Sequence, residues 1–175
     1  MKTNIALIGF MGTGKTAVGQ ALARRLGKAL VETDALIVQQ AGKPIPDIFA
    51  QDGEIAFREM EIAVIKDVAA GKDQVIACGG GVVLNKINVD RLRESGVVVC
   101  LTASPGTILR RTAKDANGRP LLVTPDRAGR VGELLRYRRP YYQRAADITI
   151  NTTRLGIEAV ADKIVSRLGE HAGNP

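Results

Sequence analysis

Eight residues near the start of the chain, Gly9 to Thr16, have the spacing G-x-x-x-x-G-K-T. Glycines in such a pattern let the backbone turn tightly and point several N–H groups at one anion. The lysine can reach the β- and γ-phosphates of a nucleotide, and the threonine hydroxyl can ligate Mg²⁺. The pattern therefore predicts binding of a nucleoside triphosphate. The predicted contacts are Gly12, Thr13, Gly14, Lys15, Thr16 and Ala17, with Thr16 as the metal ligand.

Two further stretches follow apolar segments and could face the same ligand. Asp34 precedes the apolar residues 35–38, so its carboxylate could either cap a helix or orient the hydroxyl of a substrate. The sequence leaves both roles open. Gly79–Gly81 are three consecutive glycines, which cost backbone entropy and favour close approach of a ligand over a plain flexible turn.

Three arginines are candidates for anion binding, each with a simpler alternative. Arg58 lies four residues after Glu54, and this spacing alone favours an exposed ion pair. Arg119 lies in a polar segment at about 112–125, which is either a lid that brings Arg119 to the phosphates or a solvated surface loop. Arg138 belongs to a run of arginines that is either a solvated face or a bidentate site for a carboxylate.

The surrounding sequence alternates apolar runs with helical patterns, which predicts an α/β/α domain with three layers and a central sheet of five parallel strands. In such sheets, ligands bind beyond the carboxyl ends of the strands. Pro140 is expected to kink or break its helix. The expected strands are near 4–8, 29–32, 74–78, 97–101 and 147–150, and the expected helices are near 15–26, 34–41, 46–51, 54–70, 88–95, 105–113, 126–144 and 155–168.

The totals fit one domain over residues 1–175, with a frayed tail at 170–175. The net charge of +7 is compatible with nucleic acid or with small anions, but aromatic residues are only 3%, so platforms for stacking bases are scarce. Cys78 and Cys100 lack metal-site spacing and are expected to be buried, reduced thiols. No stretch has the length of a membrane helix or the pattern of a signal peptide, so we expect a cytoplasmic protein.

In series, these features resemble the shikimate kinase family. A P-loop alone is shared by a very large superfamily, whereas the triple glycine, an Arg-Pro-Leu-Leu segment and an Arg-x-Pro-x-Tyr segment in this order are far more specific. The matching residues are Gly9–Thr16, Thr33-Asp34, Gly53-Glu54, Phe57-Arg58, Glu61, Gly79–Gly81, Arg119–Leu122, Arg138, Pro140, Tyr142 and Ala146-Asp147.

The resemblance implies a role for each matched residue. Asp34 would contact the shikimate hydroxyls, Arg58 and Arg138 would hold the shikimate carboxylate, and the backbone of Gly80, between Gly79 and Gly81, would also face shikimate. Arg119 would reach the ATP phosphates. Arg111 would flank the adenine, although Arg110 is an equal candidate and Arg154 a weaker one. Many members of the family have aspartate where this chain has Glu32, so the part that Glu32 plays in ordering the waters of Mg²⁺ stays open.

The resemblance thus implies a kinase that uses ATP and Mg²⁺ to phosphorylate the 3-hydroxyl of shikimate, within aromatic amino acid biosynthesis. Asp34, Lys15 and Arg119 would be catalytic, and the helical segment at about 34–60 would bind the substrate. We expect a monomer that binds neither nucleic acid nor membrane. The alternatives are a P-loop kinase of another small hydroxy acid, such as gluconate, and a nucleotide-binding regulator.

Overall fold

A computed structural model describes residues 2–113 and 120–172 of the chain. Its centre is a sheet of five parallel strands in the order β2-β3-β1-β4-β5, as the sequence predicts. Residue pairs such as Leu7 with Ala77 and Leu7 with Val99 set the register of the three central strands. The strands are β1 (Asn4–Gly9), β2 (Ala29–Glu32), β3 (Gln74–Ala77), β4 (Gly96–Thr102) and β5 (Ile148–Asn151).

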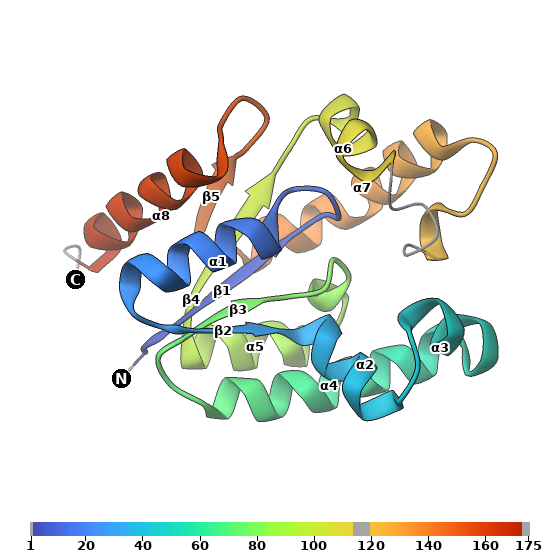
Figure 1. The fold of residues 1–175 in the computed structure, drawn as a ribbon, viewed down its shortest axis with the longest axis horizontal. Helices are drawn as coiled ribbons and strands as arrows, with labels where there is room; N and C mark the ends of the chain where they lie inside the picture. The colour runs from blue at the N-terminus through green and yellow to red at the C-terminus, as the bar shows by residue number, and fades with distance from the viewer. Residues whose placement is uncertain (1, 114–119, 173–175) are drawn as a thin grey trace.

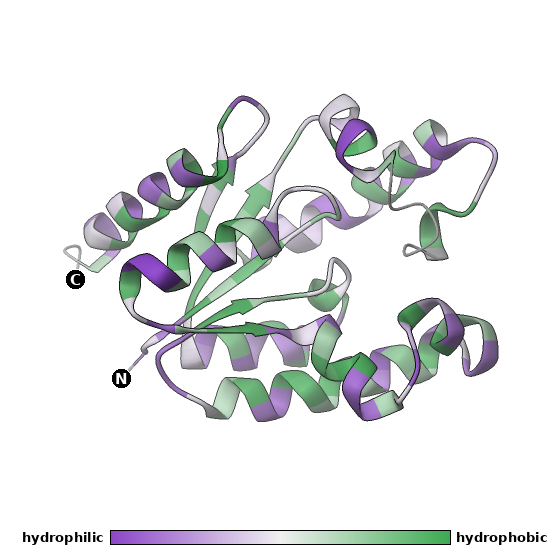
Figure 2. Ribbon diagram, viewed as in Figure 1, coloured by the Kyte–Doolittle hydropathy of each residue, from purple (hydrophilic) through white to green (hydrophobic). Residues whose placement is uncertain are grey.

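Helices cover both faces of this sheet and complete the three layers (Figure 1). The first layer packs Val18, Leu22, Val160 and Ile164 against one face, and the opposite layer packs a larger apolar core. Figure 2 shows the resulting contrast between the largely hydrophobic sheet and the mixed outer surfaces of the helices. The first layer contains α1 (Lys15–Leu26) and α8 (Ile157–Ala172), and the opposite layer contains α4 (Gly53–Ala70), α5 (Lys86–Ser95) and α7 (Arg127–Ala145).

The shorter helices gather at the edge formed by the carboxyl ends of the strands. One of them, α6, begins where the hydroxyl of Ser104 accepts a hydrogen bond from the N–H of Thr107, and Pro105 occupies its first turn. These elements therefore frame the region in which ligands of parallel sheets bind. They are α2 (Thr33–Ala41), α3 (Ile45–Gln51), η1 (Val82–Leu84), α6 (Pro105–Thr112) and η3 (Pro120–Leu122).

Two details differ from the sequence-based expectation. The helix α7 runs from Arg127 to Ala145 without ending at Pro140. Pro140 lies on the exposed side, while Arg138 and Tyr142 on the buried side hold the helix against the core, so the loss of one backbone hydrogen bond does not end it. The last helix was expected to end near residue 168, but α8 continues to Ala172, and residues 173–175 of the expected tail lie outside the described residues.

None of the helices that the structure describes is both long and apolar enough to cross a membrane. Cys78 and Cys100 are buried and free, as predicted. Burial raises the pKa of both thiols, that of Cys100 to about 11, so both stay protonated at neutral pH.

Candidate active site

Two neighbouring cavities open at the carboxyl edge of the sheet. The P-loop cavity, of about 380 Å³, is lined by Gly12, Gly14–Ala17, Glu32 and Arg111 among others. The arginine cavity, of about 100 Å³, is lined by Arg58, Glu61, Gly81 and Arg138 among others. Four residues line both cavities, so they form a common wall: Met11, Asp34, Gly79 and Gly80.

The P-loop has the backbone that its glycines predict. Gly12 and Gly14 adopt φ angles of 76° and 97°, a region that side chains disfavour. The ammonium group of Lys15 donates hydrogen bonds to the carbonyl oxygens of Gly9 and Phe10, at 2.7 and 2.9 Å. Gly14 ends the loop where α1 begins, so the positive end of the helix dipole faces the P-loop cavity.

The hydroxyl of Thr16 donates a hydrogen bond of 2.8 Å to Oε1 of Glu32, the last residue of β2. Both oxygens therefore lie together in the P-loop cavity, and oxygen ligands are those that Mg²⁺ prefers. The side chain of Glu32, which is longer than that of an aspartate, thus reaches the position beside Thr16. Among the described residues there is no cluster of three or more His, Cys, Asp or Glu that could hold a metal, so a Mg²⁺ ion here would need phosphate and water among its ligands.

The structure distinguishes between the two arginines on α6 that were candidates to flank the nucleotide. Arg111 lines the P-loop cavity and donates hydrogen bonds to the carbonyl oxygens of Gly12 and Thr152 and to the hydroxyl of Thr152. Arg110 instead bonds the hydroxyl of Thr107 on its own helix. Arg111 is therefore the arginine that joins the P-loop to the segment after β5.

Asp34 is not the capping residue of its helix. The helix α2 starts one residue earlier, at Thr33, and Glu32 holds the capping position without a side-chain hydrogen bond to the helix. The hydroxyl of Thr33 accepts a hydrogen bond of 3.1 Å from the N–H of Gly79, which ties α2 to the triple glycine. A Cβ on Gly79 would lie only 2.6 Å from Oδ1 of Asp34, so the glycine makes room for this carboxylate. Of the two roles left open by the sequence, the position on the cavity wall fits contact with a substrate.

Arg58 forms the expected ion pair with Glu54, at 3.2 Å, and the Glu54 side of the pair is exposed, but the Arg58 side is not. Only 14% of the Arg58 side chain is accessible, because its guanidinium lies against Gly81, where a Cβ would collide with it. A second ion pair of 3.0 Å joins Arg58 to Glu61. Nε of Arg58 is buried without a partner among the described residues. The prediction from spacing alone was therefore wrong about the environment of Arg58.

Glu61 also belongs to this site. From the sequence, Glu61 was identified only as one of the residues that match the family, and it was given no role. It is fully buried, and its Oε1 has no hydrogen-bond partner among the described residues. Burial raises the pKa of this carboxyl to about 7, although the charge of Arg58 opposes the shift. A signal was present in the sequence, because Glu61 interrupts the otherwise apolar buried face that Phe57 and Val64 define on α4.

Arg138, on α7, also lines the arginine cavity. It is only 3% exposed, its guanidinium lies 5.8 Å from the centre of the Phe10 ring, and its Nε is buried without a partner among the described residues. One turn further along α7, the hydroxyl of Tyr142 donates a hydrogen bond to the carbonyl oxygen of Gly80. Burial raises the pKa of Tyr142 to about 12, so the phenol keeps the proton that it donates.

The amides of Gly80 and Gly81 form no hydrogen bond with any part of the chain that the structure describes. Together with two largely buried guanidinium groups, they give the arginine cavity an excess of hydrogen-bond donors and positive charge, which suits a small anion. Arg119, the expected lid arginine, lies outside the described residues, as do all of residues 114–119 within the expected lid at about 112–125. The other predicted site residues, from Gly12 through Arg138, line one or both of the two cavities, except Thr13. Thr13 belongs to the P-loop but lines a different cavity, on the other side of the loop.

Comparison with known proteins gives a consistent result. The family model described as shikimate kinase matches residues 11–169. A shikimate kinase of Symbiobacterium thermophilum is 46% identical over 95% of this chain and 97% of its own length, and one of Thermodesulfovibrio yellowstonii is 46% identical over 93% and 92%.

Among solved structures, a shikimate kinase from Acinetobacter baumannii in complex with shikimate is similar with a TM-score of 0.95 and 34% identity, covering 99% of this chain and 97% of that one. A gluconokinase from Sinorhizobium meliloti, with a TM-score of 0.61 and 18% identity over 98% of this chain and 94% of its own, shares the fold alone. The family model, the curated relatives and the fold agree, and the chain belongs to the shikimate kinase family.

Proposed function

We propose that this chain transfers the γ-phosphoryl group of ATP to the 3-hydroxyl of shikimate, with the two cavities as the donor and acceptor sites. One observation carries the assignment of sites, namely that Asp34 lies on the wall that both cavities share. A group that orients the attacking hydroxyl must contact the acceptor and also face the phosphorus atom. Of the predicted catalytic residues, Asp34 is the one that the two cavities have in common.

On the donor side, the amides of the P-loop and the Lys15 ammonium group would bind the β- and γ-phosphates. The present bonds from Lys15 to Gly9 and Phe10 keep its charge beside the loop, where a phosphate would become a stronger partner. Thr16, with Glu32 beside it, would hold Mg²⁺, which neutralises charge on the phosphate oxygens. Arg111 would flank the nucleotide, and Arg119 would reach the phosphates, as the resemblance implies.

On the acceptor side, Arg58 and Arg138 would bind the carboxylate of shikimate. Both guanidinium groups are largely buried, so an anion placed between them would interact with little screening by water. Glu61 would act as a positioning residue, because its ion pair fixes the guanidinium of Arg58 against Gly81. The free amides of Gly80 and Gly81 would bind oxygen atoms of the acceptor.

The reaction itself would need little beyond positioning and neutralisation of charge. As the bond between the 3-hydroxyl oxygen and the γ-phosphorus forms, the bond to the leaving oxygen of ADP breaks. Asp34 would accept the proton that the hydroxyl loses. The charge that develops on the phosphoryl oxygens would be stabilised by Lys15 and Arg119.

We further propose that the enzyme is a cytoplasmic monomer with no role in nucleic-acid binding. The arginines that line the two cavities account for part of the net charge of +7 through small anionic ligands. Gel filtration tests the monomer, and a nucleic-acid binding titration against salt tests the last point.

The experiment for the reaction is formation of ADP from Mg²⁺-ATP with shikimate, with gluconate, and with no acceptor. Formation of ADP only in the reaction that contains shikimate supports the proposal. Equal rates in all three reactions would remove the acceptor assignment and leave only a P-loop ATPase. Mass analysis of the product would identify the phosphorylated hydroxyl.

A further inference from the structure

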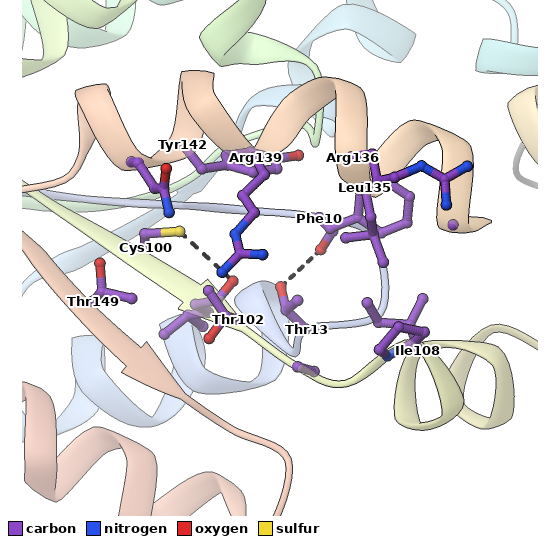
Figure 3. A pocket seen from close by; sticks show the side chains of 15 residues that line it. Phe10, Thr13, Cys100, Thr102, Ile108, Leu135, Arg136, Arg139, Tyr142 and Thr149 are labelled. Carbon is purple, nitrogen blue, oxygen red and sulfur yellow. Dashed lines mark hydrogen bonds between the residues drawn. The ribbon is translucent and has the colours of Figure 1, made fainter. Parts of the chain in front are cut away.

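A third cavity, of about 540 Å³, lies between α7, α6, the carboxyl end of β4 and Thr149 of β5. Figure 3 shows residues of its walls, among them Ile108 from α6, Thr149 from β5, Phe10 from the P-loop and Leu135 from α7. Its size lies within the range of about 300–1,000 Å³ that is typical of small-molecule sites. It shares no lining residue with the P-loop cavity or the arginine cavity.

The P-loop forms the partition between this cavity and the donor site. Phe10 and Thr13 line the third cavity, while Met11, Gly12 and Gly14 line the P-loop cavity on the other side. The hydroxyl of Thr13 donates a 2.7 Å hydrogen bond to the carbonyl oxygen of Phe10, which holds this turn in place. A molecule in the third cavity would therefore press on the back of the P-loop without occupying the nucleotide site.

The chemistry of the lining is apolar with a positive rim. Phe10, Leu101, Ile108 and Leu135 supply the apolar surface, and no acidic residue lines the cavity among the residues that the structure describes. The rim carries exposed arginines on α7, and Figure 3 shows Arg139 reaching from the helix toward Thr102. Neither Arg136 nor Arg139 forms an ion pair within the described part of the chain. The chemistry matches a ligand with an apolar body and one anionic group.

We propose that this third cavity is a binding site for a small apolar monoanion, such as an aromatic carboxylate or sulfonate, and that its occupancy changes the affinity of the acceptor site.

Two contacts link the third cavity to the acceptor site. Tyr142 lines the cavity and donates its hydroxyl hydrogen bond to the carbonyl oxygen of Gly80, which lines the acceptor site. Phe10 also lines the cavity, and the guanidinium of Arg138 lies over its ring. A ligand that moves either aromatic ring therefore moves a group that contacts the acceptor. This second half of the proposal rests on the proposed function, whereas binding in the cavity does not.

The probe for binding is 1-anilinonaphthalene-8-sulfonate, whose fluorescence rises in apolar surroundings. It is titrated into the enzyme with saturating Mg²⁺-ADP and shikimate, so that the two other cavities are occupied. N-phenyl-1-naphthylamine has the same ring system without the sulfonate and is the matched neutral probe. We expect saturable binding of the sulfonate at one site per chain, tighter than binding of the neutral amine by about fivefold or more.

Two variants locate the binding. Gly132 lines the cavity on α7, and a Cβ there would meet only the far end of Arg136, at 3.8 Å, so Gly132→Leu is the variant chosen to fill the cavity. The matched control is Gly169→Leu on α8, where a Cβ has nothing within 4 Å. We expect Gly132→Leu to weaken binding about tenfold or more and Gly169→Leu to leave it unchanged. The variant Arg139→Gln should abolish the preference for the sulfonate over the neutral amine.

Binding that is absent, that disappears with Mg²⁺-ADP present, or that is as tight in Gly132→Leu as in the wild type would overturn the site. Equal affinity for both probes would overturn the assignment of an anionic ligand. For the coupling, the KM for shikimate is measured at saturating probe, with ADP quantified by chromatography. We expect a change of about threefold or more, which Gly132→Leu abolishes. An unchanged KM would overturn the coupling, whereas an enzyme that is inactive without the probe would count against the proposed function instead.

Discussion

Replacing Glu61 by Gln tests how the acceptor site holds Arg58. In the wild type, burial raises the pKa of the Glu61 carboxyl from its ordinary value of 4.5 to about 7, even with the Arg58 charge beside it. The folded protein therefore binds this proton more tightly than the unfolded chain does. Stability from this group is greatest below pH 4.5 and falls as the pH rises to 7, because ionised Glu61 is less well tolerated in the fold.

The size of the effect follows from the two pKa values. The interval between 4.5 and about 7 corresponds to about 3 kcal/mol, at roughly 1.4 kcal/mol for each pH unit. Gln has the shape of the protonated carboxyl and does not titrate. We expect Glu61→Gln to match the wild type in free energy of unfolding near pH 4.5 and to exceed it by about 3 kcal/mol at pH 8.

The assay is urea denaturation of the wild type and Glu61→Gln at several pH values between 5 and 8. At each pH, the free energy of unfolding of the wild type is subtracted from that of the variant. The matched control is Glu54→Gln, which removes the other carboxylate from Arg58 where 50% of the Glu54 side chain is exposed, and which should cost no more than about 0.5 kcal/mol. At pH 8, where Glu61 is mostly ionised, the same Glu61→Gln variant should raise the KM for shikimate about tenfold, because Arg58 loses its charged partner. A stability difference that does not change with pH would refute the argument.

Three further variants test the two sites. Arg138→Lys should raise the KM for shikimate about tenfold or more, with the KM for ATP unchanged, because Lys cannot form a bidentate pair; an equal rise in both values would count against a role in acceptor binding. Gly79→Ala should lower kcat about a hundredfold, because its Cβ would lie 2.6 Å from Oδ1 of Asp34 and displace that carboxylate. The control is Gly80→Ala, which should fold normally because a Cβ on Gly80 has no neighbour closer than 3.5 Å. Thr16→Val should raise the Mg²⁺ concentration needed for half-maximal activity about tenfold, since the hydroxyl is lost, and an unchanged requirement would exclude Thr16 as a ligand.

The P-loop was predictable because its structure is set within a few residues. The glycine spacing, the apolar strand before it and the helical pattern after it are all local, and β1 and α1 lie where these patterns place them. The parallel sheet followed in the same way from apolar runs that alternate with helical patterns. Asp34 was ambiguous because the choice between a cap and a substrate contact depended on whether α2 began at Thr33 or two residues later, at Ala35.

The arginines could not be placed from spacing, because their surroundings come from distant segments. The pair of Arg58 with Glu54 is local, but the burial of Arg58 depends on Gly81, which arrives from the end of β3. Arg138 is buried because α7 packs over Phe10 from the P-loop, and the same packing carries the helix through Pro140. The third cavity is bounded by five separate segments and leaves no periodic trace in the sequence.

Asp34 has the central role in the proposed reaction, because it lies on the wall that both cavities share. The direct test is turnover of Asp34→Asn at saturating shikimate and Mg²⁺-ATP, with ADP affinity measured in parallel by calorimetry. Asn keeps the shape of the side chain but cannot accept the proton, so kcat should fall about a hundredfold or more, and the Kd for ADP should stay within about twofold of the wild-type value. Turnover at the wild-type rate would remove Asp34 from the mechanism and with it the assignment of the shared wall as the place of phosphoryl transfer.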